Sequence, residues 1–153
     1  MSFHFKIVPE AVGFADAASK AEVIAQMASL FARVYGLDKA ELETRLSARE
    51  ALGSTGFGRG VAIPHARMAG LKLPVASFLK LARPIDFESA DKAPVNLVFG
   101  LISPEQAGPQ HLHALAAISR LMREERFHEA LISAGGEEEL FGLLANVIDR
   151  DAA

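Results

Sequence analysis

Residues 53–67 read GSTGFGRGVAIPHAR, and this stretch decides how the surrounding chain is arranged. A glycine-rich segment with two hydroxyl side chains runs into a short apolar strand over residues 61–63. Pro64 stops that strand, because proline has a fixed φ and no backbone N–H. His65 is therefore presented at a strand end, beside glycines whose backbone N–H groups can approach an anion. A neutral imidazole is a competent nucleophile near pH 7, so we expect His65 to carry a phosphoryl group.

The glycine segment does not match the nucleotide-binding motifs. A P-loop requires Lys and then Ser or Thr after its last glycine, whereas Gly58 is followed by Arg59 and Gly60. The dinucleotide-binding motif G-x-G-x-x-G does not match either, because the glycines fall at 56, 58 and 60. In addition, the P-loop and the dinucleotide-binding motif follow a strand, whereas this segment precedes one. Ser54 and Thr55 add hydroxyl donors, so we expect the segment to bind phosphoryl oxygens, with a mobile surface turn as the alternative. A Ser-His-Asp hydrolase is not favoured, because the chain has no G-x-S-x-G motif.

Secondary-structure signals extend on both sides of this stretch. Ser19 and Asp38 each precede a glutamate by three residues, a capping-box pattern that predicts a helix at each site. The first helix is expected to stop at Gly36 and the second near Arg49. Periodicity predicts further strands over 3–7, 75–81 and 95–102, and helices over 109–123, 125–133 and 137–148. Strands interspersed with helices predict one α/β domain over residues 1–153, with helices on both faces of a sheet.

Composition excludes several classes of protein. The formal net charge of −3 argues against non-specific binding to nucleic acid, which requires a basic surface. The absence of cysteine excludes disulfides and thiolate nucleophiles and is compatible with a cytoplasmic location. The longest apolar run, residues 95–102, is too short to insert across a membrane, and the N-terminus does not resemble a signal peptide.

A pair of histidines, His111 and His113, raises the possibility of a metal site. On a helix the two side chains lie about 200° apart and cannot share a ligand, given about 3.6 residues per turn. The expected apolar face places His111 inward and His113 outward, and we expect no metal or other cofactor. The alternative for His111 is a core histidine satisfied by a backbone carbonyl. We take this face to be formed by Leu112, Leu115, Ile118 and Met122.

Taken together, these motifs resemble a known family, the IIA domain of the fructose/mannitol class of the bacterial phosphotransferase system. The similarity covers nearly the whole chain. With no IIB, IIC or HPr-like domain in the sequence, the nitrogen-regulatory type is the branch that we expect. The segments that carry the resemblance are GSTG at 53–56, IPH at 63–65, HLH at 111–113, ARE at 48–50, PIDF at 84–87 and EEEL at 137–140.

The resemblance implies a three-layer α/β/α sandwich around a mixed β-sheet. It implies that His65 accepts phosphate from a phosphohistidine on an HPr-like phosphocarrier protein, and that His111 and Arg49 line the site and stabilise the phosphorylated state. The phosphorylated chain would then regulate target proteins, or pass phosphate to a IIB component for sugar uptake. Arg59 and Arg67 are candidates for docking a partner, with solvated surface cations as the alternative.

Overall fold

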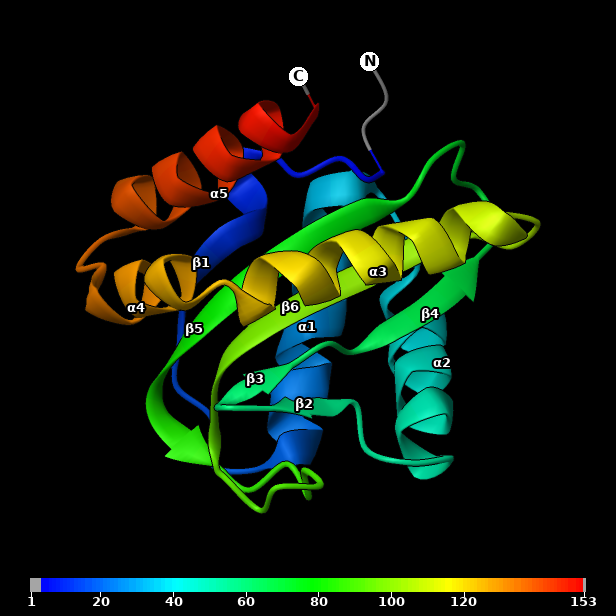
Figure 1. The fold of residues 1–153 in the computed structure, drawn as a ribbon. Coiled ribbons are helices and arrows are strands. Elements are labelled where there is room, and N and C mark those ends of the chain that lie inside the picture. Colours follow the sequence, from blue (N-terminus) through cyan, green and yellow to red (C-terminus); the bar gives the residue numbers. More distant parts are fainter. Residues whose placement is uncertain (1–3, 153) are drawn as a thin grey trace.

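A mixed β-sheet forms the centre of the molecule (Figure 1). The computed structural model describes residues 4–152. Strand β6 organises the sheet, because it pairs antiparallel with β5 on one side and parallel with β3 and β4 on the other. The order is β1-β5-β6-β3-β2, with β4 also paired to β6. The strands are β1 (Val12–Ala15), β2 (Gly56–Gly58), β3 (Val61–Ala62), β4 (His65–Met68), β5 (Val75–Ile85) and β6 (Val95–Pro104).

Helices cover both faces of this sheet, which confirms the predicted three-layer α/β/α arrangement. Helices α1 (Lys20–Tyr35) and α2 (Lys39–Ala51) pack on one face, behind the sheet in Figure 1. Helices α3 (Pro109–Arg123), α4 (Glu125–Ser133) and α5 (Glu137–Ala152) cover the other face. Each face buries its own cluster of apolar side chains, so the sheet is apolar on both sides. No described helix is long and apolar enough to cross a membrane.

Both predicted N-caps are present at the helix starts, but among the described residues the return bond that would complete each capping box is not: Glu22 accepts from the Ala18 N–H, and Glu41 pairs with Arg45. The Ser19 side chain accepts a hydrogen bond from the Glu22 backbone N–H at 3.2 Å, and Asp38 accepts one from the Glu41 N–H at 2.9 Å. Gly36 ends α1 in the left-handed conformation, with φ of 70°, which glycine adopts without strain. These local signals fix the ends of α1 and the start of α2.

The predicted strand over residues 3–7 is wrong in its extent. Residue 3 lies outside the described residues, and between His4 and Ile7 only Lys6 makes a β-bridge, to Val75. The chain turns into a short 3-10 helix, η1 (Pro9–Ala11), before a strand can propagate. The strand on this side of the sheet is β1, whose short Val-Gly-Phe-Ala sequence gives little signal. Phe5 is nevertheless buried against Phe99, as alternation predicts.

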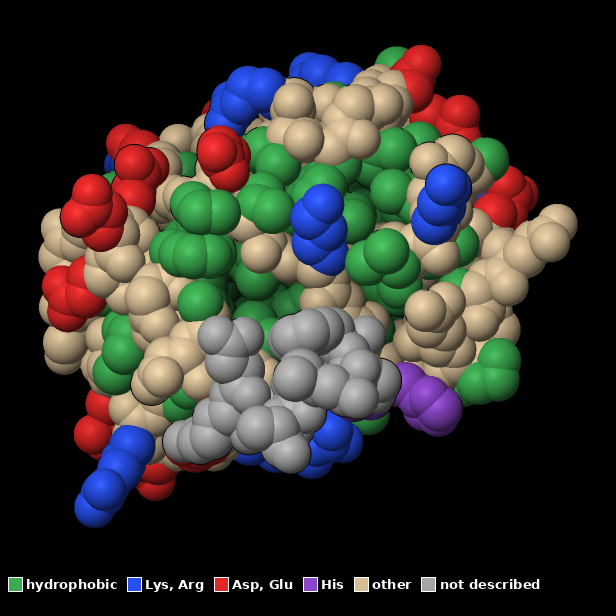
Figure 2. Space-filling model, turned by 90° about the horizontal axis from the view of Figure 1, so that it is seen from above, with side chains coloured by type: hydrophobic (Ala, Val, Ile, Leu, Met, Phe, Trp, Pro, Cys, Tyr) green, Lys and Arg blue, Asp and Glu red, His purple; other side chains and the backbone are tan. Residues whose placement is uncertain are grey.

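Hydrophobic side chains also gather at the end of the molecule where both termini lie. Figure 2 looks onto this end and shows a hollow lined with apolar groups. Its walls come from the segment around Phe5 and Ile7, from Leu73 and from one face of α5, including Phe141 and Ile148. None of its lining residues is a candidate site residue from the sequence, so the site must be sought elsewhere in the fold.

Candidate active site

Three elements meet at an open cavity of about 550 Å³. Helix α2 contributes Arg45, Arg49 and the following Leu52, strand β4 contributes His65 and Arg67, and the first turn of α3 contributes His111. The structure therefore brings together four of the residues proposed from sequence, His65, His111, Arg49 and Arg67. They come from parts of the chain that only the folded sheet places side by side.

Both ring nitrogens of His65 have assigned partners. The Nδ1 atom lies 2.8 Å from the carbonyl oxygen of Ile63, and Nε2 lies 3.2 Å from Nε of Arg49. A carbonyl can only accept, so Nδ1 carries the ring proton; the Arg49 N–H can only donate, so Nε2 carries the lone pair. The two contacts agree on one neutral tautomer, in which Nε2 carries the lone pair.

The second histidine, His111, faces His65 from the first turn of α3. The ring centroids are 5.6 Å apart with an interplanar angle of 49°. His111 is only 6% exposed, and its Nδ1 lies 2.6 Å from the hydroxyl of Ser103, which is fully buried in β6. With Nδ1 occupied inside the protein, Nε2 is the ring nitrogen left for a group bound in the cavity.

Burial and neighbouring cations keep both imidazoles neutral. Burial lowers the pKa of His65 below its usual value, and the charge of Arg49 lowers it further, against opposing contributions from the Ile63 carbonyl and Glu50. Burial also lowers the pKa of His111 to about 4, with further contributions from His65 and Arg67. The positive charge of the cavity therefore comes from arginines, which attract an anion while His65 keeps its lone pair.

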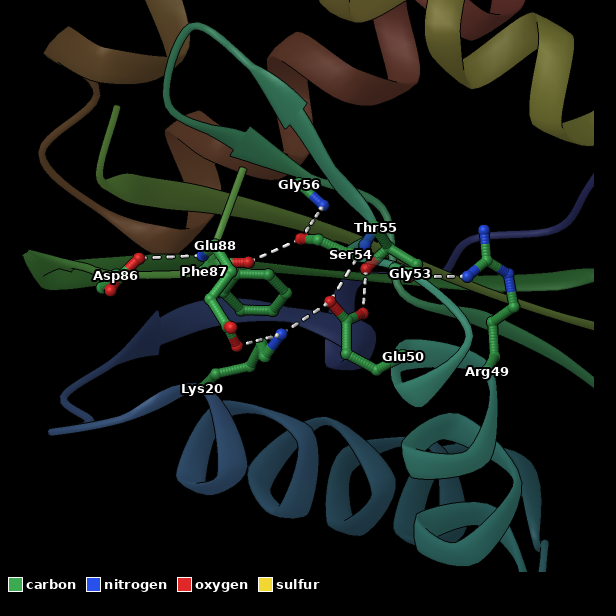
Figure 3. A network of polar contacts seen from close by, with 10 residues as sticks. All are labelled: Lys20, Arg49, Glu50, Gly53, Ser54, Thr55, Gly56, Asp86, Phe87 and Glu88. Carbon is green, nitrogen blue, oxygen red and sulfur yellow. Dashed lines mark hydrogen bonds and ion pairs between the residues drawn. The ribbon is translucent and has the colours of Figure 1, made fainter. Parts of the chain in front are cut away.

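A buried carboxylate, Glu50, lies next to Arg49 and braces the glycine segment (Figure 3). It accepts hydrogen bonds from the backbone N–H of Thr55 at 2.9 Å, from the Thr55 hydroxyl and from Lys20 at 3.1 Å. Lys20 also pairs with Glu88 at 2.9 Å. Burial alone would lower the pKa of Lys20, but the two carboxylates raise it above its usual value. The network ties α1, α2 and the glycine segment together.

The hydroxyls of Ser54 and Thr55 point into this network. Ser54 Oγ donates to the Phe87 carbonyl at 2.5 Å and accepts from the Gly56 N–H at 3.0 Å. Neither Ser54 nor Thr55 lines the cavity around His65. The N–H groups of Thr55 and Gly56, which we expected to bind an anion, already have protein partners. The structure thus places both residues where they shape the glycine segment, with their hydroxyls already engaged.

The remaining cation proposed from sequence, Arg59, lies away from the cavity. It lies at the turn between β2 and β3. Its guanidinium is 3.4 Å from the Glu125 carboxylate, and its backbone N–H donates to the Asp91 carboxylate. His128 also contacts the Arg59 carbonyl, at 2.9 Å. The turn is therefore fastened to α4, and Arg59 is not brought together with His65.

The structure confirms the prediction that His111 and His113 lie on different faces of a helix. His111 points inward, whereas His113 is exposed and its ring lies beside His4, with centroids 6.3 Å apart. The side chains that the structure describes, residues 4–148, include no group of three or more histidine or acidic side chains placed to hold a metal ion. One residue was misassigned: Leu112 is 64% exposed, because the buried face of α3 runs through His111, Ala114, Ile118 and Leu121.

Sequence reasoning missed Ser103, Glu50 as a bracing group and the Ile63 carbonyl. Ser103 follows an apolar run, and a serine at that place is as typical of a strand that leaves the core as of a residue in a functional site. Glu50 did carry a signal: an acidic residue near a helix C-terminus opposes the helix dipole and therefore needs another partner. The role of the Ile63 carbonyl depends on the path of the chain around Pro64, which has no sequence signature of its own.

Comparison with known proteins shows the family to which the chain belongs. Residues 8–147 match the family described as "Phosphoenolpyruvate-dependent sugar phosphotransferase system, EIIA 2". The chain belongs to this family, whose members are phosphotransfer carriers. It is 41% identical to a "Nitrogen regulatory protein" of Pseudomonas aeruginosa over 130 residues, which is 84% of each chain.

Solved structures show the same fold. The crystal structure of nitrogen regulatory protein IIA-Ntr from Neisseria meningitidis superposes with a TM-score of 0.83 at 33% identity, over 90% of this chain and 95% of that one. The complex of IIA mannitol with phosphorylated IIB mannitol from Escherichia coli gives a TM-score of 0.76 at 20% identity, over 93% and 99% of the two chains. At that lower identity the second likeness concerns the fold alone.

Replacing Glu50 by Ala is expected to lower the free energy of unfolding by about 2–4 kcal/mol, because it leaves Lys20 and the Thr55 N–H without their buried acceptor. Urea unfolding measures the change. Glu43→Ala is the matched control, since Glu43 is an exposed partner of Lys39 at 3.8 Å on the same helix. That control should change stability by at most about 0.5 kcal/mol. Equal effects of the two substitutions would contradict the bracing role of Glu50.

Titration of the ring C–H resonances by NMR should place both site histidines below the ordinary histidine pKa of 6.5, with His111 near 4. Since the unfolded chain binds protons at about pH 6.5 and the folded site does not, the free energy of unfolding should fall as the pH drops from 6.5 toward 4. A midpoint at or above 6.5 for either residue would contradict the buried, cation-flanked site.

Proposed function

We propose that the chain is a phosphocarrier that accepts a phosphoryl group on Nε2 of His65 from an HPr-like phosphocarrier protein. The observation that carries this proposal is the tautomer of His65, which aims a lone pair at a cavity lined by arginines and a second neutral histidine. Membership of a phosphotransfer family supports the same chemistry.

The transfer step needs positioning and charge stabilisation more than covalent assistance. Nε2 of His65 attacks phosphorus and forms an N–P bond, while the N–P bond to the donor histidine breaks and returns its electron pair to the donor ring. The His65 proton stays on Nδ1, held by the Ile63 carbonyl. No metal or cofactor is required by this balance.

Arg49 changes partner as a consequence of the reaction. Its Nε–H donates to the lone pair of His65 Nε2, and that lone pair is consumed when the N–P bond forms. The Arg49 N–H is then available to a phosphoryl oxygen, with which it forms a stronger, charge-assisted hydrogen bond. Arg49 also donates to the Gly53 carbonyl at 2.8 Å, so the same side chain links the phosphorylation site to the glycine segment.

The surroundings of the cavity offer a docking surface for protein partners. Leu52 is 85% exposed at the end of α2 and lines the cavity. Arg67 also lines the cavity and is exposed. Its backbone carbonyl accepts a hydrogen bond from Arg45, whereas its guanidinium has no hydrogen bond or ion pair with the described residues and is available to a partner. An exposed leucine flanked by cations is typical of an interface with an apolar centre and a polar rim. Docking there would bring a phosphohistidine within reach of His65.

Phosphorylation would also serve as a signal. The phosphoryl group brings roughly two negative charges at neutral pH and reverses the charge of the surface that a partner meets. On this basis, and on the similarity to the nitrogen regulatory proteins, we assign the chain a regulatory role toward target proteins in the cytoplasm. A second candidate is transfer to a IIB component for sugar uptake, which is supported by membership of a sugar phosphotransferase family.

Incubation with phosphoenolpyruvate, enzyme I and an HPr-like protein should raise the intact mass by one acid-labile phosphoryl group, because His65 presents its Nε2 lone pair. His65→Ala should take up none. His111→Ala should slow uptake by about tenfold or more, the value of one charge-assisted hydrogen bond in the transition state. His113→Ala is the matched control and should stay near wild type, since His113 points away from the cavity.

The two candidate roles separate in a binding assay. A regulatory protein should bind its targets differently in the phosphorylated and unphosphorylated states. Rapid transfer to a IIB protein, together with phosphate-independent binding of every target tested, would contradict the regulatory role. Acid-labile phosphate on the His65→Ala protein at the wild-type rate would contradict the assignment of His65 itself.

A further inference from the structure

Ser103 is a polar residue near the end of strand β6, after a run of buried apolar residues. The buried part of β6 from Leu97 to Ile102 has no polar side chain, and Ser103 is itself fully buried. A buried hydroxyl lowers stability unless it is hydrogen-bonded, and the partner of Ser103 is Nδ1 of His111, 2.6 Å away. The only polar group of this kind on β6 is thus committed to a residue of the proposed site.

Sheet register explains how Ser103 reaches His111. In the parallel pairing of β4 with β6, His65 stands opposite Leu101 and Arg67 opposite Ser103. Side chains two residues apart on a strand share a face, so His65, Arg67 and Ser103 all belong to the face covered by α3. Leu101 packs in the same core cluster as Ile118 of α3, which confirms the direction. Ser103 therefore lies beneath the first turn of the helix that carries His111.

His111 is held neutral, so its single ring proton must be on one nitrogen or the other. Burial is the largest cause of its pKa of about 4, the charge of Arg67 contributes as well, and its place in the first turn of α3 disfavours the imidazolium further. If Nδ1 donates to Ser103, Nε2 presents a lone pair to the cavity. If Ser103 donates to Nδ1, Nε2 presents an N–H.

The two histidines of the site have partners of different chemistry. Nδ1 of His65 meets a carbonyl, which can only accept and therefore leaves a lone pair on Nε2. Nδ1 of His111 meets a hydroxyl, which can donate and so leave the proton on Nε2. A phosphoryl group on His65 is an acceptor with negative charge, which repels a lone pair and binds an N–H. The arrangement therefore fits two histidines with different roles: His65 as the nucleophile and His111 as the hydrogen-bond donor.

We propose that Ser103 is a positioning residue for phosphotransfer: its hydroxyl donates to Nδ1 of His111 and fixes the tautomer whose Nε2–H binds a phosphoryl oxygen on His65. The inference rests on the proposed function of the site and adds a residue to it. It assigns Ser103 no contact with the phosphoryl group itself.

Ser103→Ala tests this role, with Ser77→Ala as the matched control. Ser77 is an equally buried serine on the neighbouring strand β5, but its hydroxyl has no hydrogen-bond partner among the described residues. Ser103→Ala should slow phosphate uptake by about tenfold, and Ser77→Ala should leave it unchanged. In a His111→Ala background, Ser103→Ala should have no further effect, because the group that it positions is gone.

Nitrogen-15 NMR of protein with labelled histidine reads the tautomer without any phosphotransfer. The wild-type spectrum should show His111 with its proton on Nε2, and Ser103→Ala should shift His111 toward a mixture of tautomers, while thermal unfolding reports on folding. Three results would overturn the proposal. The first is phosphate uptake by Ser103→Ala within twofold of the wild-type rate. The second is a slowing by Ser103→Ala that is as large in the His111→Ala background as in the wild type. The third is a wild-type spectrum in which the His111 proton is on Nδ1. Failure of the wild-type chain to accept phosphate would instead contradict the proposed function, and the NMR result would still test Ser103.

Discussion

The hydrogen bond from Nδ1 of His65 to the carbonyl of Ile63 spans a single intervening residue, Pro64. Its short span makes it a property of the local backbone, and the sheet fixes that backbone on both sides: the Ile63 N–H donates to the Thr55 carbonyl and the Pro64 carbonyl accepts from Leu101. Because a carbonyl cannot donate, this bond decides which nitrogen of His65 carries the lone pair, and therefore which nitrogen would attack phosphorus under the proposed function. The orientation of Arg49 and the proposed role of His111 have meaning only once that nitrogen is fixed.

Arg49 and Glu50 are adjacent at the end of α2, but their side chains contact different parts of the fold. Arg49 turns toward the cavity and joins His65 to the Gly53 carbonyl, whereas Glu50 turns toward the sheet and joins Thr55 to Lys20. A helix end can do both because successive side chains point about 100° apart, with about 3.6 residues per turn. The glycine segment is thus held from both sides, and its shape depends on the charges of α2 and α1.

The positive character of the cavity resides in its arginines, while its histidines are kept neutral by burial and by those same arginines. This separation suits phosphotransfer, since an imidazolium has no lone pair with which to attack. Under the proposed function, a phosphoryl group on His65 would change the surface charge around Leu52 without a large rearrangement of the fold.

Much of this was predictable from sequence where the determining contacts are local. The capping residues Ser19 and Asp38 placed two helices, and helical periodicity correctly separated His111 from His113. Predictions failed or remained open where distant segments decide the outcome. In the segment expected as a strand over residues 3–7, one residue forms a β-bridge among those described. Leu112 is exposed, beside the buried helix face to which it was assigned. The hydroxyls of Ser54 and Thr55 donate to the Phe87 carbonyl and to Glu50. Ser103 is adjacent to His111 only through the register of β4 and β6.

The central claim is that His65 reacts through Nε2 while the Ile63 carbonyl retains the proton on Nδ1. It is tested most directly by nitrogen-15 and phosphorus-31 NMR of the phosphorylated chain with labelled histidine. The structure predicts phosphorus coupled to Nε2 of His65 and an Nδ1 that still carries its proton. Phosphorus coupled to Nδ1 would contradict the claim, because that atom would have to give up the Ile63 carbonyl and turn outward before it could react.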